Sequence, residues 1–203
     1  SRTWACNGSV IINGNKITDM GSYGTLNFKK ALAKSSNVAF AQIAVELGAS
    51  KMTAAANKMG FNSSFSLDGI PTAAGSYDVS GASADELGWS GVGQYTDLAN
   101  PFHLLVLMGA IANGGTPVMP YMVQSVVSPV GIPVKVGTAQ TGNEMVSPTT
   151  AARLREYMRY NVTDSYGDDL FPGMNVCAKT GTAEVGGGKK PNCWMVGYST
   201  NNS

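Results

Sequence analysis

Two short segments carry side chains whose types and spacing could support chemistry. The first is Ser35-Ser36-Asn37, which lies between two stretches of helical pattern. Side chains two residues apart do not face each other within one helix. At a break between helices, however, Ser35 and Asn37 can point into one cavity. The alternative is structural, because serine and asparagine at a helix junction commonly cap helix ends.

The second segment is Lys179-Thr180-Gly181-Thr182, within a predicted strand. Its cation, two hydroxyl groups and bare glycine backbone suit an anionic, amide-bearing ligand lying along the strand. Gly181 would let the ligand backbone approach, and free strand amides can donate to a peptide or an oxyanion. The alternative is a solvated lysine beside threonines that favour strands. Because side chains alternate between strand faces, a twist or bulge near Gly181 would have to bring Lys179 and Thr180 into one site.

Helices should position the first segment. The hydrophobic spacing predicts a helix starting near residue 25, capped by Thr25 or Asn27. A second helix follows Asn37 and ends at Gly48. A third begins with Ser50 as its cap.

Strands should position the second segment. Residues 61–93, rich in glycine, serine and aspartate, are predicted to form surface loops. The later elements are a helix over 96–112, short strands over 116–140, a helix over 148–161 capped by Ser147, and strands over 175–185 and 193–199. Helices and strands do not alternate regularly, so the predicted fold class is α+β.

Composition restricts the class of protein. The chain has 203 residues, 43% hydrophobic and 13% charged, against about 25% charged in typical proteins. We expect a substantial core, and we exclude a charged disordered chain or a coiled coil. The net charge of +1 provides no basic field, so no nucleic-acid partner is expected. The longest apolar run, 102–112, is too short to span a bilayer.

The cysteines and the histidine predict no metal site. Three cysteines without a CxxC pair, together with the single His103, exclude a zinc site of the usual spacing. We expect His103 to be a packed, hydrogen-bonded side chain. Cys177 and Cys193 lie on neighbouring predicted strands; we expect free buried thiols, with a disulfide as the alternative.

Together, Ser35-Ser36-Asn37 and Lys179-Thr180-Gly181 resemble the S-x-N and K-T-G elements of penicillin-binding proteins. The two elements lie 144 residues apart, in the family's order. The resemblance covers nearly all of the chain and is to the class B penicillin-binding proteins, the monofunctional D,D-transpeptidases that cross-link peptidoglycan. Further similar segments are 26–32, 59–61, 67–69, 91–94, 112–115 and 194–198. The implied fold is an incomplete serine β-lactamase/D,D-peptidase fold, an antiparallel sheet with helices.

One family element is absent. No lysine has Ser or Thr three positions before it, so the sequence contains no S-x-x-K nucleophile motif. In the family this motif precedes the S-x-N element, which would place it before Ser1, and the strands that normally follow Tyr198 are also missing. We therefore expect residues 1–203 to be a partial transpeptidase (penicillin-binding) domain, truncated at both ends and inactive by itself. Loss of a core helix would expose apolar surface, which predicts a homodimer or local disorder.

The resemblance implies a role for each site residue in the complete domain. Ser35 would relay a proton between the base and the leaving nitrogen, and Asn37 would hold the substrate amide and position the base. Lys179 would hold Ser35 and add positive charge beside the substrate carboxylate. The Thr180 and Thr182 hydroxyls would bind that carboxylate, and the Thr182 amide would complete the oxyanion hole. No metal or organic cofactor is implied, because serine, lysine and backbone amides suffice.

The implied partners are peptidoglycan stem peptides ending in D-Ala-D-Ala, and β-lactams. The implied location is the extracytoplasmic face of the bacterial cell membrane, reached through an N-terminal anchor outside this sequence. Two alternatives stay open: a degenerate, non-catalytic scaffold, and a serine β-lactamase or β-lactam sensor of the same fold. A class A β-lactamase would have S-D-N, whereas the middle residue here is Ser36. Class D enzymes and sensors usually end this motif in Val rather than Asn.

Overall fold

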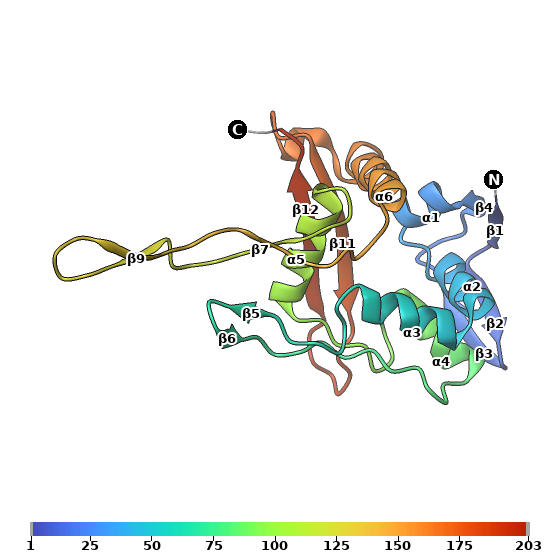
Figure 1. Ribbon diagram of the computed structural model, residues 1–203. Helices are drawn as coiled ribbons and strands as arrows, with labels where there is room; N and C mark the ends of the chain where they lie inside the picture. The colour runs from blue at the N-terminus through green and yellow to red at the C-terminus, as the bar shows by residue number, and fades with distance from the viewer. Residues whose placement is uncertain (1, 202–203) are drawn as a thin grey trace.

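Helices and antiparallel strand pairs make up the chain, which confirms the predicted α+β class (Figure 1). The computed structural model describes residues 2–201. Short N-terminal hairpins and helices lie beside a C-terminal part built around one long hairpin, and a slender arm extends away from the body. Within the described residues, no helix is long and apolar enough to cross a membrane.

The N-terminal part contains two strand pairs and three helices, of which the first two share a core with the strands. Strand β1 (Thr3–Cys6) pairs with β4 (Gly24–Asn27), and β2 (Ser9–Ile12) pairs with β3 (Asn15–Thr18). The helices are α1 (Phe28–Ala33), α2 (Asn37–Leu47) and α3 (Ala49–Lys58). Their shared apolar core contains Trp4, Cys6, Leu26, Ala31, Val38 and Ala39. This core fixes the break between α1 and α2 that carries the first motif.

Local capping explains where these helices begin. The Asn27 side chain accepts a hydrogen bond from the backbone of Lys30, so Asn27 is the cap of α1. Gly48 ends α2 with φ 79°, a left-handed value that favours glycine. The prediction that Ser50 caps α3 is wrong, because the chain leaves Gly48 directly into a helix that starts at Ala49.

Helix α4 (Ala84–Val92) lies in a stretch that the sequence predicted to be loop. The Ser83 N–H donates to the Glu86 carboxylate at 2.8 Å and closes the first turn. Two glycines of α4 face α2, and a Cβ on Gly91 would lie 2.3 Å from the Cβ of Ala44. The glycines therefore permit close helix packing, which a sequence pattern cannot distinguish from loop composition.

The C-terminal part surrounds the long antiparallel hairpin of β11 (Val176–Ala183) and β12 (Asn192–Ser199). Helix α5 (Pro101–Ala112) packs along β12, and α6 (Pro148–Asn161) packs along β11. Helix α6 has Ser147 as its cap, as predicted, and continues into a π-helical turn, η1 (Val162–Tyr166), and a short 3-10 turn, η2 (Asp168–Leu170). His103 is buried and contacts the Met59 carbonyl at 2.7 Å, which confirms its predicted packing role.

The arm is the part of the chain that points away from the body in Figure 1. Its base is the pair β7 (Val118–Met119) and β10 (Gln140–Thr141), and its outer part is the pair β8 (Ser125–Val127) and β9 (Pro133–Val136). A smaller hairpin, β5 (Ser66–Leu67) and β6 (Ile70–Pro71), interrupts the predicted 61–93 loop.

All three cysteines are free. The hairpin register places Cys177 opposite Tyr198 and Cys193 opposite Thr182, so the alternative of a disulfide between Cys177 and Cys193 is wrong. Cys177 is buried, as expected, but Cys193 is exposed near the turn of the hairpin.

Candidate functional site

Ser35 and Lys179 meet where the α1–α2 junction faces β11. The backbone of Ser35 has φ 50°, a left-handed conformation that is uncommon for serine and that turns the chain sharply between the helices. The Lys179 ammonium group donates a hydrogen bond to Ser35 Oγ across 144 residues of sequence. The fold therefore brings the two motifs into direct contact.

Helix α6 and its π-helical turn hold the junction beside β11. Lys29 at the start of α1 pairs with Glu156 at 3.0 Å, and Lys34 just after α1 pairs with Asp164 at 3.3 Å. Ser165 Oγ also donates to the carbonyl of Ala33, at 3.3 Å. The two ends of α1 are thus tied to α6 and to the π-helical turn that follows it, and these contacts hold the junction beside β11.

Ser36, the middle residue of the first motif, has a structural role. Its side chain is fully buried, and its Oγ accepts from the Ala39 N–H at 3.1 Å as the cap of α2. The same hydroxyl donates to Asp19 at 2.7 Å. The capping interpretation of the triplet therefore holds for Ser36.

Asn37 opens α2, and its side chain is bound to the N-terminal strands. Its Nδ2 donates to the carbonyl of Thr18 at 2.9 Å. Among residues 2–201, no hydrogen bond joins Asn37 to Ser35 or Lys179. A shared cavity for Ser35 and Asn37 stays a prediction.

The pairing of β11 with β12 is regular through the second motif. Lys179 lies opposite Val196, Thr180 opposite Met195, and Gly181 opposite Trp194. The bulge offered as one way to re-aim these side chains is therefore absent. Lys179 therefore reaches Ser35 from a regular strand, and its Nζ also donates to the carbonyl of Thr180 at 2.7 Å.

Tyr166 is a member of this site that the sequence did not reveal. Its phenol oxygen accepts from the Thr180 N–H at 3.0 Å and lies 3.1 Å from Thr180 Oγ1. Tyr166 ends the π-helical turn η1, an irregular segment of a kind that often occurs at functional sites. No motif marks a tyrosine at this distance from Thr180, so only the folded structure places it here.

Gly181 and Thr182 lie at an open surface. Both residues are exposed. A Cβ on Gly181 would come no closer than 3.9 Å to its nearest neighbour, the Trp194 Cβ, so packing within the chain does not require glycine there. The free space in front of the strand is what a ligand backbone would need.

Burial lowers the pKa of the Lys179 ammonium, and the nearby Tyr166 phenol partly opposes this effect. Desolvation disfavours the charged form of a lysine. A lysine with a lowered pKa, in hydrogen-bond contact with a serine hydroxyl, is suited to proton transfer. The Ser35–Lys179 pair is thus chemically suited to general acid–base work.

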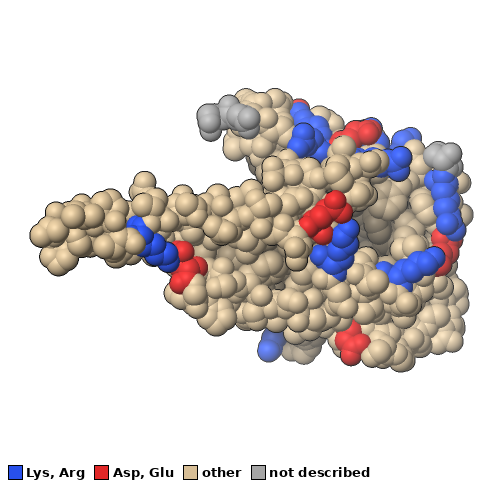
Figure 2. Space-filling model, viewed as in Figure 1, with Lys and Arg blue, Asp and Glu red and all other residues tan. Residues whose placement is uncertain are grey.

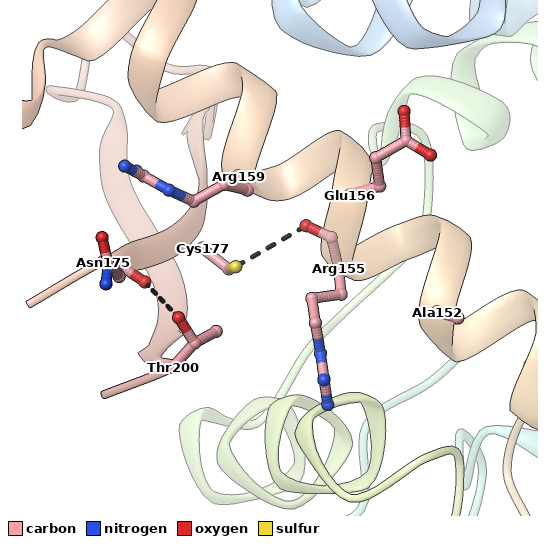
Figure 3. A pocket seen from close by; sticks show the side chains of 7 residues that line it. All are labelled: Ala152, Arg155, Glu156, Arg159, Asn175, Cys177 and Thr200. Carbon is pink, nitrogen blue, oxygen red and sulfur yellow. Dashed lines mark hydrogen bonds between the residues drawn. The ribbon is translucent and has the colours of Figure 1, made fainter. Parts of the chain in front are cut away.

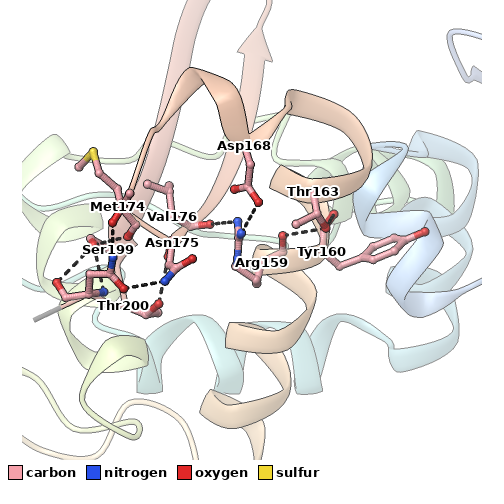
Figure 4. A network of polar contacts seen from close by, with 11 residues as sticks. Arg159, Tyr160, Thr163, Asp168, Met174, Asn175, Val176, Ser199 and Thr200 are labelled. Carbon is pink, nitrogen blue, oxygen red and sulfur yellow. Dashed lines mark hydrogen bonds and ion pairs between the residues drawn. The ribbon is translucent and has the colours of Figure 1, made fainter.

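A cavity of the described chain lies elsewhere, at the start of β11. Its volume is about 390 Å³, and it is lined by Ala152, Arg155, Glu156, Arg159, Asn175, Cys177 and Thr200 (Figure 3). Arg159 is engaged there with the Asp168 carboxylate and, at 3.1 Å, with the Val176 carbonyl (Figure 4). The hydrogen bond from Arg159 holds the pKa of Asp168 below its usual range. Arg159 therefore holds the start of β11 against α6. None of the motif residues lines this cavity.

Titratable side chains do not gather into a metal site: across residues 2–201, no cluster of three or more His, Cys, Asp or Glu could hold a metal ion. The polar groups near Ser35 are a hydroxyl, an ammonium, a phenol and strand amides. That inventory fits acyl transfer through hydroxyl groups and oxyanion donors.

Sequence comparison identifies relatives of known type. The penicillin binding protein transpeptidase domain model matches residues 2–203. The peptidoglycan D,D-transpeptidase PbpA of Mycobacterium tuberculosis is 30% identical over 184 residues, covering 88% of this chain and 37% of the relative. PbpA of Mycolicibacterium smegmatis is 30% identical over 185 residues, covering 86% and 36%. The chain thus spans about a third of the length of the curated relatives it matches.

Solved structures have the same fold. The D,D-transpeptidase domain of a peptidoglycan glycosyltransferase from Eggerthella lenta is 29% identical with a TM-score of 0.85, covering 96% of this chain and 51% of that one. The imipenem acyl-enzyme complex of penicillin-binding protein A from M. tuberculosis is 26% identical with a TM-score of 0.87, covering 97% and 46%. The contact between the two motifs, the matched family model and these relatives agree, and the chain belongs to the transpeptidase domain family of the class B penicillin-binding proteins.

Proposed function

We propose that this chain forms the part of a peptidoglycan D,D-transpeptidase domain that carries the S-x-N and K-T-G elements. The observation that supports it best is the hydrogen bond from Lys179 to Ser35, which joins the two elements at one place. Because the sequence has no S-x-x-K motif, the nucleophilic serine and its base would come from outside residues 1–203. The isolated chain would therefore bind no β-lactam covalently.

In the complete domain, the nucleophile would attack the D-alanyl carbonyl of a stem peptide or the β-lactam carbonyl. Acyl transfer needs a proton carrier for the leaving nitrogen, and Ser35 Oγ, held by Lys179, is placed to serve. The lowered pKa of Lys179 assists that transfer. Asn37 would hold the substrate amide after releasing the carbonyl of Thr18, which it binds here.

The edge of β11 would bind the substrate. The hydroxyls of Thr180 and Thr182 would receive the terminal carboxylate, and the Thr182 amide would contribute to the oxyanion hole. Gly181 leaves room for the ligand backbone. The PbpA structure solved as an imipenem acyl-enzyme shows that a relative of this fold reacts covalently with a β-lactam. The corresponding reaction here would take place at the extracytoplasmic face of the membrane.

A class A β-lactamase would carry a Glu-x-x-Leu-Asn loop whose Glu activates water, and no Glu of this sequence has Leu-Asn at those positions. Glu86 instead accepts the Ser83 N–H at 2.8 Å at the start of α4. The hydrolase alternative therefore gains no support from this region.

The test is acylation by a fluorescent penicillin. In the complete protein, Lys179→Ala should reduce the acylation rate by about 10²–10³-fold, the usual cost of removing a charge-stabilising group from an acyl-transfer site. Lys190→Ala is the matched control, because Lys190 lies exposed in the β11–β12 turn. The chain 1–203 alone should show no penicillin adduct by intact mass. An adduct on it, or an unchanged rate in Lys179→Ala, would contradict the proposal.

A further inference from the structure

One edge of β11 is covered by side chains from α6 and the turn that follows it. The Val176 carbonyl accepts from Arg159 at 3.1 Å, and the Ala178 carbonyl accepts from Asn161 at 3.1 Å. The Thr180 N–H donates to Tyr166 at 3.0 Å. In an antiparallel pair, alternate residues direct both backbone groups away from the partner strand. These contacts therefore mark one continuous outer edge of β11, and Thr182 is the next residue in that series.

Thr182 is the first position on this edge that the chain leaves open. Lys179 already occupies the Thr180 carbonyl, at 2.7 Å. Within residues 2–201, no side chain contributes a hydrogen bond to the Thr182 backbone, and Thr182 is exposed. Tyr166 thus lies at the boundary between the edge closed by the protein and the edge open to a ligand.

The phenol of Tyr166 also fixes the Thr180 hydroxyl. Its oxygen receives the Thr180 N–H, and it is 3.1 Å from Thr180 Oγ1. A phenol has one proton to donate. If that proton goes to Thr180 Oγ1, the proton of the threonine hydroxyl is free to point toward an incoming carboxylate.

We propose that Tyr166 is a positioning residue for carboxylate recognition: it orients the Thr180 hydroxyl toward the ligand and makes Thr182 the first strand position available for pairing. The inference rests on the proposed function, since it assigns the orientation of the group that would bind the carboxylate. The ring of Tyr166 packs beside Val162, Val176 and Ala178, so the residue has a rigid base from which to act. The nearby phenol also keeps the Lys179 pKa from falling further.

The variant Tyr166→Phe isolates the phenol oxygen and keeps the ring packing. In the complete protein, the probes are penicillin G and its methyl ester, which lacks the free carboxylate. Penicillin G should acylate Tyr166→Phe about tenfold more slowly than wild type, the effect of losing one hydrogen bond of ordinary strength. The slower reaction should result from a larger dissociation constant of the non-covalent penicillin G complex. The rate of acylation by the ester should stay within about twofold of the wild-type rate, because the ester has no carboxylate for Thr180 to recognise.

Tyr160→Phe is the matched control. Tyr160 lies on α6, and its phenol donates to Asp164 at 2.8 Å; within the described residues it makes no hydrogen bond to β11. Its acid-to-ester preference should equal that of wild type. An unchanged preference in Tyr166→Phe, or an equal loss for both probes, would overturn the inference even if the variant has a lower Tm. Wild-type protein that neither probe acylates would overturn the proposed function and this inference together, so the wild-type and variant measurements distinguish the two failures.

Discussion

The α1–α2 junction and the base of the arm each contain an aspartate that accepts two hydrogen bonds. At the junction, Asp19 accepts from Ser36 Oγ at 2.7 Å and from the Val38 N–H at 3.0 Å. At the base of the arm, Asp68 accepts from the N–H groups of Met122 at 2.6 Å and Val123 at 2.9 Å. A carboxylate that accepts two hydrogen bonds is thus found in two very different parts of the molecule.

Their surroundings differ sharply. Ser36 and Val38 are both 0% exposed, and Val38 lies in the N-terminal core. The arm is exposed along its length, with Val130 at 79%. Its only charged residue between positions 118 and 141 is Lys135, and its visible face in Figure 2 is almost entirely neutral.

The comparison teaches that two similar hydrogen bonds can have different consequences. A buried group that loses its partner suffers the full cost of desolvation, whereas an exposed group exchanges its partner for water. We therefore expect Asp19 to contribute to global stability and Asp68 to order only the base of the arm. This difference can be measured at each aspartate.

The largest effect is expected for Asp19→Ala. It leaves the buried Ser36 hydroxyl without its acceptor and should lower the free energy of unfolding by about 2–3 kcal/mol. Denaturant titration followed by circular dichroism measures it. Asp19→Asn, which keeps one acceptor oxygen, should lose less. An Asp19→Ala protein as stable as wild type would show that the buried aspartate of the helix junction contributes no more to stability than the exposed aspartate of the arm.

A smaller, local effect is expected for Asp68. Asp68 and Gly69 have φ 50° and 88°, and this two-residue turn between β5 and β6 favours residues that tolerate positive φ. Asp68→Gly keeps that geometry and removes the carboxylate oxygen, Oδ2, that accepts both hydrogen bonds. Amide hydrogen exchange of Met122 and Val123 should accelerate about tenfold, while the midpoint of global unfolding stays unchanged.

Asp68→Asn serves as the matched variant, because asparagine keeps the turn and one acceptor oxygen. Its exchange rates should lie between those of wild type and Asp68→Gly. A large fall in global stability in Asp68→Gly would show that the arm is coupled to the core, contrary to the comparison.

The smallest effect is a pH dependence of the arm contact. Hydrogen bonds from the Met122 and Val123 backbones lower the pKa of Asp68. A carboxyl group whose pKa is lower when folded stabilises the contact above its unfolded pKa of about 4, and the contribution is lost as pH falls through the folded value. Amide NMR shifts of Met122 and Val123 should therefore be constant above about pH 5 and change only in more acid solution. The Asp68→Asn protein should show no such titration at these two amides.

Several features of the fold could be predicted because their causes are local. Asn27 and Ser147 were recognisable as helix caps, since a capping side chain bonds to the backbone a few residues ahead. The β11–β12 hairpin followed from two apolar strands around a Gly-rich turn. Helix α4 was not predicted. Its Gly91 is required because Ala44, 47 residues away in the chain, packs too close for a side chain there, and the sequence does not show this contact.

The sequence by itself determined the family, through Ser35-Ser36-Asn37 and Lys179-Thr180-Gly181, and the local starts and ends of most elements. Only the tertiary structure decided that the lysine reaches Ser35 along a regular strand, that Asp19 holds the helix junction, and that Tyr166 completes the edge of β11. The reason is physical. Motifs and caps depend on neighbours in the chain, whereas these contacts join distant residues whose meeting depends on how α1, α6 and β11 pack together.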